Sequence, residues 1–359
     1  MEFSVTNNNY KKLIIRNLKE SKLPELKDVN ILICFECNLL TDIPNINGLF
    51  ELSCINCTSL TSIQNINSLR KLNCLGCTSL TSLPNFKVLK NLWCKNCTSL
   101  TSIPNIKGLK ILNCNGSTSL TSIPNIKGLE KLNCSDCSSL TSIPHIEYLK
   151  ELCCSNCTLI TTIPTIKFLN KLNCSNCTSL KSIPIINELR NLNCSNCNSL
   201  KSIPNIKFIF DINCSRCRSL VSISNINSLL GLNCSYCTSL TTIPKFCSLM
   251  SLNCEYCTSL TSIPNIDKLI NVNCSYCNLL TSIPKNDKMR CVFWDCPWIN
   301  PDQKKISNLI KLQKWFDRYL RGKSIERLMP LVDMYWYSPD GPGGKMAIKR
   351  LNEIANKKS

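Results

Sequence analysis

Apolar residues recur along this chain in a fixed frame of 20 residues. One copy reads Leu-x-x-Leu-x-Cys-x-x-Cys-x-x-Leu-x-x-Ile-Pro-x-Ile-x-x, and the copies follow one another without a slip over residues 31–290. A constant period of this length is typical of a solenoid, in which each coil buries its apolar side against its neighbours. The pattern therefore predicts one elongated array of thirteen coils, although 359 residues could otherwise form two or more compact domains.

The spacing within one copy predicts its local structure. Inward and outward positions alternate around Leu112 and Cys114, which is the period of a β-strand, and successive strands are expected to form one parallel sheet. The other half of the copy carries Pro in eleven of thirteen cases, with Gln64 and Ser224 as the exceptions. Because Pro fixes φ and removes a hydrogen-bond donor, we expect an extended arm there. Twenty residues leave no room for a helix as well.

The frame resembles the consensus L-x-x-L-x-L-x-x-N/C-x-L of the leucine-rich-repeat superfamily, with Leu109, Leu112 and Leu120 at matching positions. The 20-residue length is similar to the short class known from bacterial effectors. The many cysteines and the segment around Trp336 are similar to leucine-rich-repeat proteins of giant amoeba-infecting viruses of the mimivirus type. The resemblance implies a leucine-rich-repeat solenoid with a parallel β-sheet on its concave face and a helix-poor convex side. It also implies a protein partner, host or viral.

The two ends depart from the frame, as terminal coils must if they are to seal the core. Residues 1–30 are expected to form an N-terminal cap, 31–290 thirteen repeats, and 291–359 a degenerate last repeat with a short α-helical C-terminal cap. Asn300 and Pro301 have the features of a helix start. Apolar residues then follow at helical spacing, namely Ile306, Leu309, Ile310, Leu312, Trp315, Phe316, Tyr319 and Leu320. The alternative is a small docking module.

The net charge of +19 raises the question of nucleic-acid binding. Phosphate recognition needs basic residues clustered in a stripe. The best column is interrupted by Glu147 and consists of Lys87, Lys107, Lys127, Lys167 and Lys207. Binding of RNA along this column is therefore kept as a secondary hypothesis, and the chain is not expected to bind nucleic acid.

The N-terminal residues 1–5 are not followed by an apolar stretch, so no classical secretion signal is expected, and no segment approaches the length of a membrane span. We therefore expect an intracellular location, the host cytoplasm or a viral factory according to the resemblance, and a monomer without membrane contact.

Of the 29 cysteines, 13 occupy the first and 12 the second position of the recurring Cys-x-x-Cys pair. A free thiol behaves as a small apolar side chain, so we expect two ladders of buried thiols. The alternatives are disulfides, or zinc or another metal held by stacked pairs. Ser117 takes the second position of one copy without disturbing the frame, and the only histidine, His145, lies in the Pro-containing arm. Neither a metal nor a cofactor is therefore predicted.

One histidine cannot serve the usual Ser-His or Cys-His arrangements, so the chain is predicted to be no enzyme and to have no catalytic residues. The leading hypothesis is a non-enzymatic protein-interaction scaffold. The alternative is a substrate adaptor, in which the repeats capture a target and the C-terminal region docks to a cellular modifying enzyme.

Outward strand positions form a column of asparagines from Asn73 to Asn273, which is either a binding code or a self-satisfying array of hydrogen bonds. A serine column beside it is expected to share the same polar face. Trp, Tyr and Arg are enriched at binding hot spots, whereas tyrosines in consecutive coils can also simply stack on one another. The predicted partner-binding residues are Trp93, Lys95, Arg216, Tyr236, Tyr256 and Tyr276.

Overall fold

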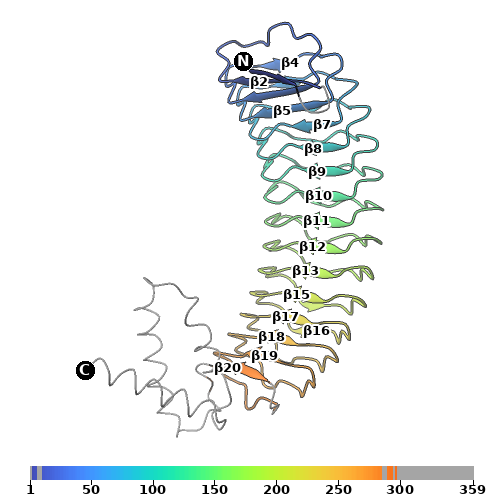
Figure 1. The fold of residues 1–359 in the computed structure, drawn as a ribbon. Helices are drawn as coiled ribbons and strands as arrows, with labels where there is room; N and C mark the ends of the chain where they lie inside the picture. The colour runs from blue at the N-terminus through green and yellow to red at the C-terminus, as the bar shows by residue number, and fades with distance from the viewer. Residues whose placement is uncertain (1, 6–9, 285–288, 294–295, 297–359) are drawn as a thin grey trace, which may run out of the picture.

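The computed structural model describes residues 2–5, 10–284, 289–293 and 296, and these residues form one curved column of stacked coils (Figure 1). A 16-stranded sheet runs along the column, with one strand from each coil. The first strand lies antiparallel on the second, and all later neighbours in the sheet are parallel. The predicted parallel β-solenoid is therefore confirmed.

The strands of this sheet are short because a corner follows each of them. In spatial order they are β1 (Glu2–Val5), β2 (Lys11–Arg16), β3 (Ile31–Phe35), β5 (Glu51–Ile55), β7 (Lys71–Asn73), β8 (Asn91–Trp93), β9 (Ile111–Asn113), β10 (Lys131–Asn133), β11 (Glu151–Cys153), β12 (Lys171–Asn173), β13 (Asn191–Asn193), β15 (Asp211–Asn213), β17 (Gly231–Asn233), β18 (Ser251–Asn253), β19 (Asn271–Asn273) and β20 (Arg290–Val292). Between the repeats the register is 20 residues, so Leu132 lies beside Leu112 and Leu152.

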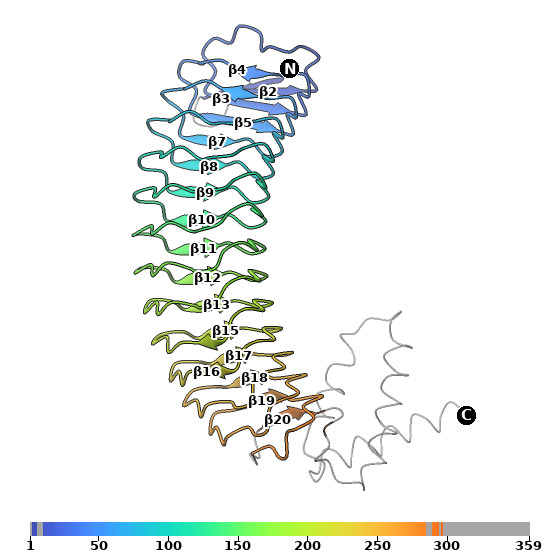
Figure 2. The ribbon, with the colours of Figure 1, turned by 180° about the vertical axis from the view of Figure 1, so that it is seen from behind.

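The Pro-containing arm forms the opposite side of each coil (Figure 2). Two pairs of two-residue strands occur there, β4 (Asp42–Ile43) with β6 (Ser62–Ile63), and β14 (Ser202–Ile203) with β16 (Ser222–Ile223). In the part of the chain that the structure describes, this side contains no helix. The extended arm is as predicted.

Both ends of the sheet use a coil of 19 residues instead of 20. Lys12 on β2 lies beside Ile31, and Asn271 lies beside Arg290 on β20. The region expected to be an N-terminal cap thus supplies two strands, and the degenerate last repeat supplies β20. The helices predicted for the C-terminal region lie outside the described residues.

Each full coil buries seven side chains against the coils above and below. In one coil these are Leu149, Leu152, Cys154, Cys157, Ile160, Ile163 and Ile166. Full burial of a Leu or Ile side chain contributes about 1.5–3 kcal/mol before the entropy of ordering the coil is subtracted. Phe86 and Phe246 replace an isoleucine in two coils and are also buried. The core is therefore one unbroken column, as the period predicted.

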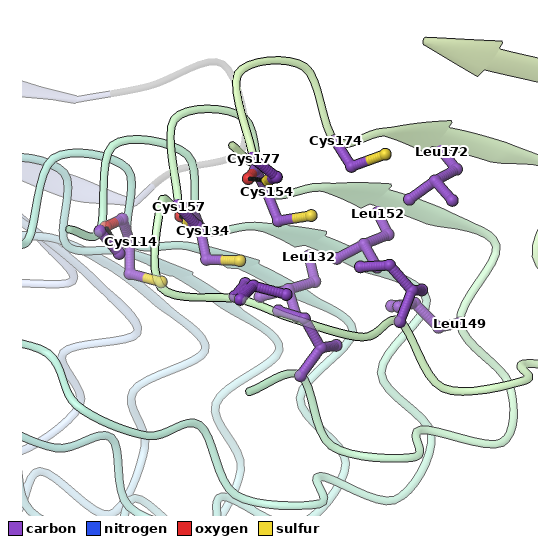
Figure 3. Close-up of a cluster of buried hydrophobic side chains, with 14 of the residues drawn as sticks. Cys114, Leu132, Cys134, Leu149, Leu152, Cys154, Cys157, Leu172, Cys174 and Cys177 are labelled. Atoms are coloured by element: carbon purple, nitrogen blue, oxygen red, sulfur yellow. Dashed lines mark hydrogen bonds between the residues drawn. The ribbon is translucent and has the colours of Figure 1, made fainter. Parts of the chain in front are cut away.

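In most repeats from Cys74 on, the two cysteines of the pair are the first and last residues of a β-turn, whereas β3 and β5 continue one residue past Cys34 and Cys54. The Cys177 N–H donates to the Cys174 carbonyl oxygen at 3.3 Å, and the same bond recurs in other coils. The residue before the second cysteine has a positive φ, the feature of the third residue of a type II turn. The turn points both thiols inward, where those of successive coils lie side by side (Figure 3).

Each second-position thiol also links its coil to the preceding one. The Cys177 thiol donates to the Cys154 carbonyl oxygen of the preceding coil at 3.1 Å. In the coil that lacks this cysteine, the Ser117 hydroxyl donates the same bond to the Cys94 carbonyl oxygen at 2.9 Å. Ser117 therefore fits the frame because it keeps the donor, and the cysteine at this position acts as a hydrogen-bond donor as well as an apolar side chain.

The expected thiol ladders are confirmed by burial. Cys153 is half-buried and Cys247 is exposed, whereas all the other cysteines are buried. Burial raises the pKa of the Cys94 and Cys77 thiols well above the ordinary value, because the thiolate would lose its hydration.

We expect Cys177→Ala to lower the free energy of unfolding by about 1–3 kcal/mol, because the Cys154 carbonyl loses a donor inside the core. Cys177→Ser keeps a donor, as Ser117 does, and is expected to stay within about 1 kcal/mol of the natural protein. Urea denaturation under reducing conditions measures both. Equal losses for the two variants would contradict the role of the thiol as a donor.

The buried thiols are expected to make the fold sensitive to alkali. Burial raises the pKa of the Cys94 and Cys77 thiols in the folded chain, so the contribution of these two groups to stability is complete below the ordinary thiol pKa of about 8.5 and is lost as pH rises above it. Each of these two thiols then lowers the free energy of unfolding by up to about 1.4 kcal/mol per pH unit. The urea midpoint is expected to fall between about pH 7.5 and about pH 9.5. An unchanged midpoint would refute this.

Candidate partner-binding surface

A shallow groove follows the outer face of the sheet. It runs from Trp93 on β8 to Asn253 on β18 and is lined by the outward side chains of the strands between them. Trp93 is half-exposed there, and Lys95 is exposed in the corner that follows its strand. Asparagine, lysine and glutamate make up 11 of its 24 lining residues. The leucines and Ile212 at its floor are buried, so Trp93 and Ile111 are the large apolar side chains among the outward residues that line it.

The asparagines of the groove shape their own turns. The Asn133 side-chain oxygen accepts a hydrogen bond from the Ser135 N–H at 3.1 Å, and Asn173 and Asn193 do the same two residues on. This local bond is typical of an Asx turn. Of the two alternatives left by the sequence, the self-satisfying array is the one that the structure supports.

The serine column is less accessible than expected. Ser135 and Ser275 are buried, and Ser155 is half-buried, because the residue lies inside the corner rather than on the sheet face. The polar face predicted from two columns is therefore carried mainly by the asparagines. Where Cys153 replaces an asparagine, its thiol lies 3.0 Å from the Ser135 hydroxyl and accepts a hydrogen bond from the Asn173 amide at 3.4 Å.

The third residue of every Cys-x-x-Cys turn has a left-handed backbone. These residues have φ between 53° and 73°, and they are Glu36, Asn56, Gly76, Asn96, Gly116, Asp136, Asn156, Asn176, Asn196, Arg216, Tyr236, Tyr256 and Tyr276. Gly, Asn and Asp tolerate this region, whereas other L-residues are destabilised there by about 1–2 kcal/mol. Their N–H groups continue the sheet ladder around the corner, as in the bond from Asn176 to the Ser195 carbonyl oxygen at 2.7 Å.

The last four of these positions hold bulky side chains that contact one another. The Tyr236 and Tyr256 rings stack with centroids 4.6 Å apart, and the Tyr256 and Tyr276 rings stack at 4.2 Å. The Arg216 guanidinium lies over the Tyr236 ring at 4.9 Å. We call these four residues the aromatic ladder. It lies along the edge where β15, β17, β18 and β19 end, and its tyrosines are half-exposed while Arg216 is exposed.

The structure brings together four of the six predicted site residues. Trp93 and Lys95 lie six coils away from Arg216, which corresponds to about 29 Å at the usual strand spacing. One compact site cannot include both groups. The stacking alternative for the tyrosines is correct as a description of their contacts, and it leaves the tyrosines half-exposed and Arg216 exposed.

The edge where the strands begin carries apolar residues that the sequence prediction missed. Phe210, Leu230, Met250 and Ile270 are exposed in four consecutive coils, each directly before its strand. Their signal was present in the sequence, because the same position holds Lys or Arg in most of the preceding coils. The prediction considered outward strand positions only, and the position before the strand was not among them.

Farther along this edge the charges are paired. The Lys110 and Lys150 ammonium groups each lie 2.9 Å from the Glu130 carboxylate and lower its pKa to about 2 through these hydrogen bonds. Part of the positive charge on this edge is thus neutralised within the chain. The Lys87 column lies exposed at the next corner, and His145 is exposed, as predicted.

Within the described residues, no three His, Cys, Asp or Glu side chains are grouped so that they could hold a metal ion. Those residues also contain no helix long and apolar enough to cross a membrane.

No family model matches the chain, and no curated protein is similar to it in sequence. Among solved structures, it is similar to a leucine-rich repeat protein from Bacteroides ovatus, with 17% identity and a TM-score of 0.49 over 83% of this chain and 91% of that one. It is also similar to a leucine rich cell surface protein from Faecalibacterium prausnitzii, with 15% identity and a TM-score of 0.34 over 84% of this chain and 94% of that one. The assignment of the fold as a parallel β-solenoid therefore rests on the arrangement of strands in this structure and not on these two similarities.

We expect Tyr236→Asn to be more stable than Tyr236→Ala by about 1 kcal/mol, because Asn tolerates the left-handed backbone and both variants lose the same stacking. Thermal or urea denaturation of the two variants provides the comparison. If the alanine variant were equally stable, the positive φ would not be a source of strain at this corner.

Proposed function

We propose that the protein is a non-enzymatic protein-interaction scaffold, and that its partner docks on the aromatic ladder. The observation that carries this proposal is the placement of three tyrosines and an arginine at left-handed positions in four consecutive coils. Eight of the nine preceding coils place Asn, Asp or Gly at this position with the same positive φ. The folding of the coil therefore does not require these large side chains.

Stacking offsets only part of the strain. An aromatic pair contributes about 0.5–1.5 kcal/mol beyond its buried area, which is similar to the cost of the left-handed backbone at each tyrosine. Strained residues that bring no clear gain in stability are typical of binding sites. Tyr and Arg are also the residue types that dominate binding energy at protein interfaces.

The chemistry of the ladder favours a partner with a flat apolar patch beside an acidic group. The half-exposed rings stack along two coil spacings, with ring centroids 4.6 and 4.2 Å apart. Arg216 extends this row at one end and is exposed, so it can donate hydrogen bonds to a carboxylate. The neighbouring asparagines supply further donors along the sheet face.

The test compares the full-length natural chain with the triple variant Tyr236→Asn, Tyr256→Asn, Tyr276→Asn in affinity capture from amoebal lysate under reducing conditions. Asparagine occupies the same turn position in Asn156, so the variant keeps the coil. We expect the captured partner to be lost, and the purified partner to bind the variant at least about 30-fold more weakly, the effect of losing a hot spot.

The matched control changes a different stacked pair, Tyr148 and Phe168, whose centroids lie 5.8 Å apart on the strand-start edge. Tyr148→Asn with Phe168→Asn is expected to leave capture unchanged. Retention of the partner by the triple tyrosine variant would refute the ladder as the site and would direct attention to Trp93 and Lys95.

The adaptor hypothesis depends on residues 300–359, which lie outside the described residues, and it stays a prediction. The viral resemblance, the intracellular location and the monomeric state also stay predictions.

A further inference from the structure

The apolar rail, which we define as Phe210, Leu230, Met250 and Ile270, lies on the edge opposite the aromatic ladder. The four side chains are 40%, 41%, 43% and 37% exposed. Their neighbours in the sheet direction are one another, because the Leu230 N–H donates to the Phe210 carbonyl oxygen at 2.8 Å and the pattern continues to Ile270. An unbroken row of exposed apolar residues on one edge is the kind of surface that another segment covers.

At one end, the rail stops at a charged residue. The Arg190 guanidinium lies over the rings of Phe208 and Phe210 at 5.2 and 5.3 Å. Beyond Arg190 the same column returns to polar residues, Lys150 and Asn170 among them. The apolar row is thus confined to the last coils of the repeat array.

The other end of the rail leads to the point where the chain leaves the solenoid. Because Asn271 pairs with Arg290, the residue that continues the rail after Ile270 is Met289, which is half-buried against the core. The Cys296 thiol then donates to the Cys274 carbonyl oxygen at 3.1 Å and fixes the chain beside β19. Cys296 donates to Cys274 as Cys277 donates to Cys254, so it occupies the corner after the strands, one coil beyond the last residue of the rail.

We propose that the rail is covered by this chain's own C-terminal segment 301–320, bound through its apolar side. The rail spans three coil spacings, about 14 Å, and a 20-residue helix is about 30 Å long. The apolar positions of this segment recur at helical spacing with Lys and Arg between them, and they include Ile306, Leu309, Ile310, Phe316 and Leu320. Segment and rail are therefore matched in chemistry, and the segment is longer than the rail.

Position favours this occupant over a second copy of the chain. The segment is tethered to Cys296, which lies at the same end of the sheet as the rail but at the corner after the strands. A three-residue strand is about 10 Å long and four linker residues span up to about 14 Å, so the segment can reach the rail and has an effective concentration in the mM range. A second copy of the chain would have to compete with this tethered segment for the rail. Coverage of the rail leaves the aromatic ladder on the opposite edge accessible, so this inference and the proposed function stand or fall separately.

The test places a photo-crosslinking amino acid at Leu230 in the full-length chain and identifies the crosslinked peptides by mass spectrometry. We expect peptides from 301–320 in a product of single-chain mass. The control position is Val221, which is 51% exposed on the other side of the coil and is expected to give no such product. Crosslinks only between two chains, equal yields at both positions, or no crosslink from Leu230 would each overturn the proposal.

A charge variant provides a second and independent readout. Leu230→Lys with Met250→Lys keeps the coil, because Lys90, Lys110 and Lys150 occupy the same position in other coils. Limited proteolysis of the full-length variant is expected to cleave segment 301–320 at least about tenfold faster than in the natural chain. This rate follows if the two lysines lower the equilibrium constant for docking of the segment at least about tenfold. The same double change at Val221 and Thr241, on the far side, is expected to leave the rate unchanged. Equal rates for the rail variant and the natural chain would overturn the proposal.

Discussion

The structure depends on one corner, the tight turn between the two cysteines of each coil. A left-handed residue turns the chain there while its N–H continues the sheet ladder to the next coil, as Asn176 does toward Ser195. Both cysteines of the turn are buried in the core, and the cysteine at the turn's end also donates to the preceding coil. Thiols meet both demands, since they are small and apolar and still carry a donor, and this explains why cysteine and once serine occur there.

Because the left-handed residue recurs in every repeat, departures from the usual residue types at this corner are informative. The coils from Arg216 to Tyr276 keep the left-handed turn but replace its usual Asn, Asp or Gly with large side chains. The same four coils replace the polar residue before the strand with an apolar one, from Phe210 to Ile270. The residue types on both edges of the sheet thus change in the same four coils, while the core positions of these coils stay apolar. Such a change alters the surface and keeps the apolar core that holds the coils together.

The core and the surface follow different physical rules in this molecule. Core contacts are made between equivalent positions of neighbouring coils. The positions that are buried in one coil are therefore buried in the other coils as well. Surface properties depend instead on which side chains the 20-residue register brings side by side along an edge. Lys110 and Lys150 pair with Glu130 in this way, and the tyrosine rings stack in this way. Surface side chains that contact one another therefore form columns along the solenoid.

The sequence by itself determined the solenoid, the parallel sheet, the extended arm and the buried columns, because a period of 20 with fixed apolar positions has one way to bury them. It also pointed to four residues that do lie together, Arg216 and the three tyrosines. The number of repeats between them also places Trp93 six coils away. Only the tertiary structure decided that Ser135 is buried in the corner and that the asparagines bond to their own turns. Backbone geometry at the corner and contacts between coils set these features, and neither can be read from the order of residues within one repeat.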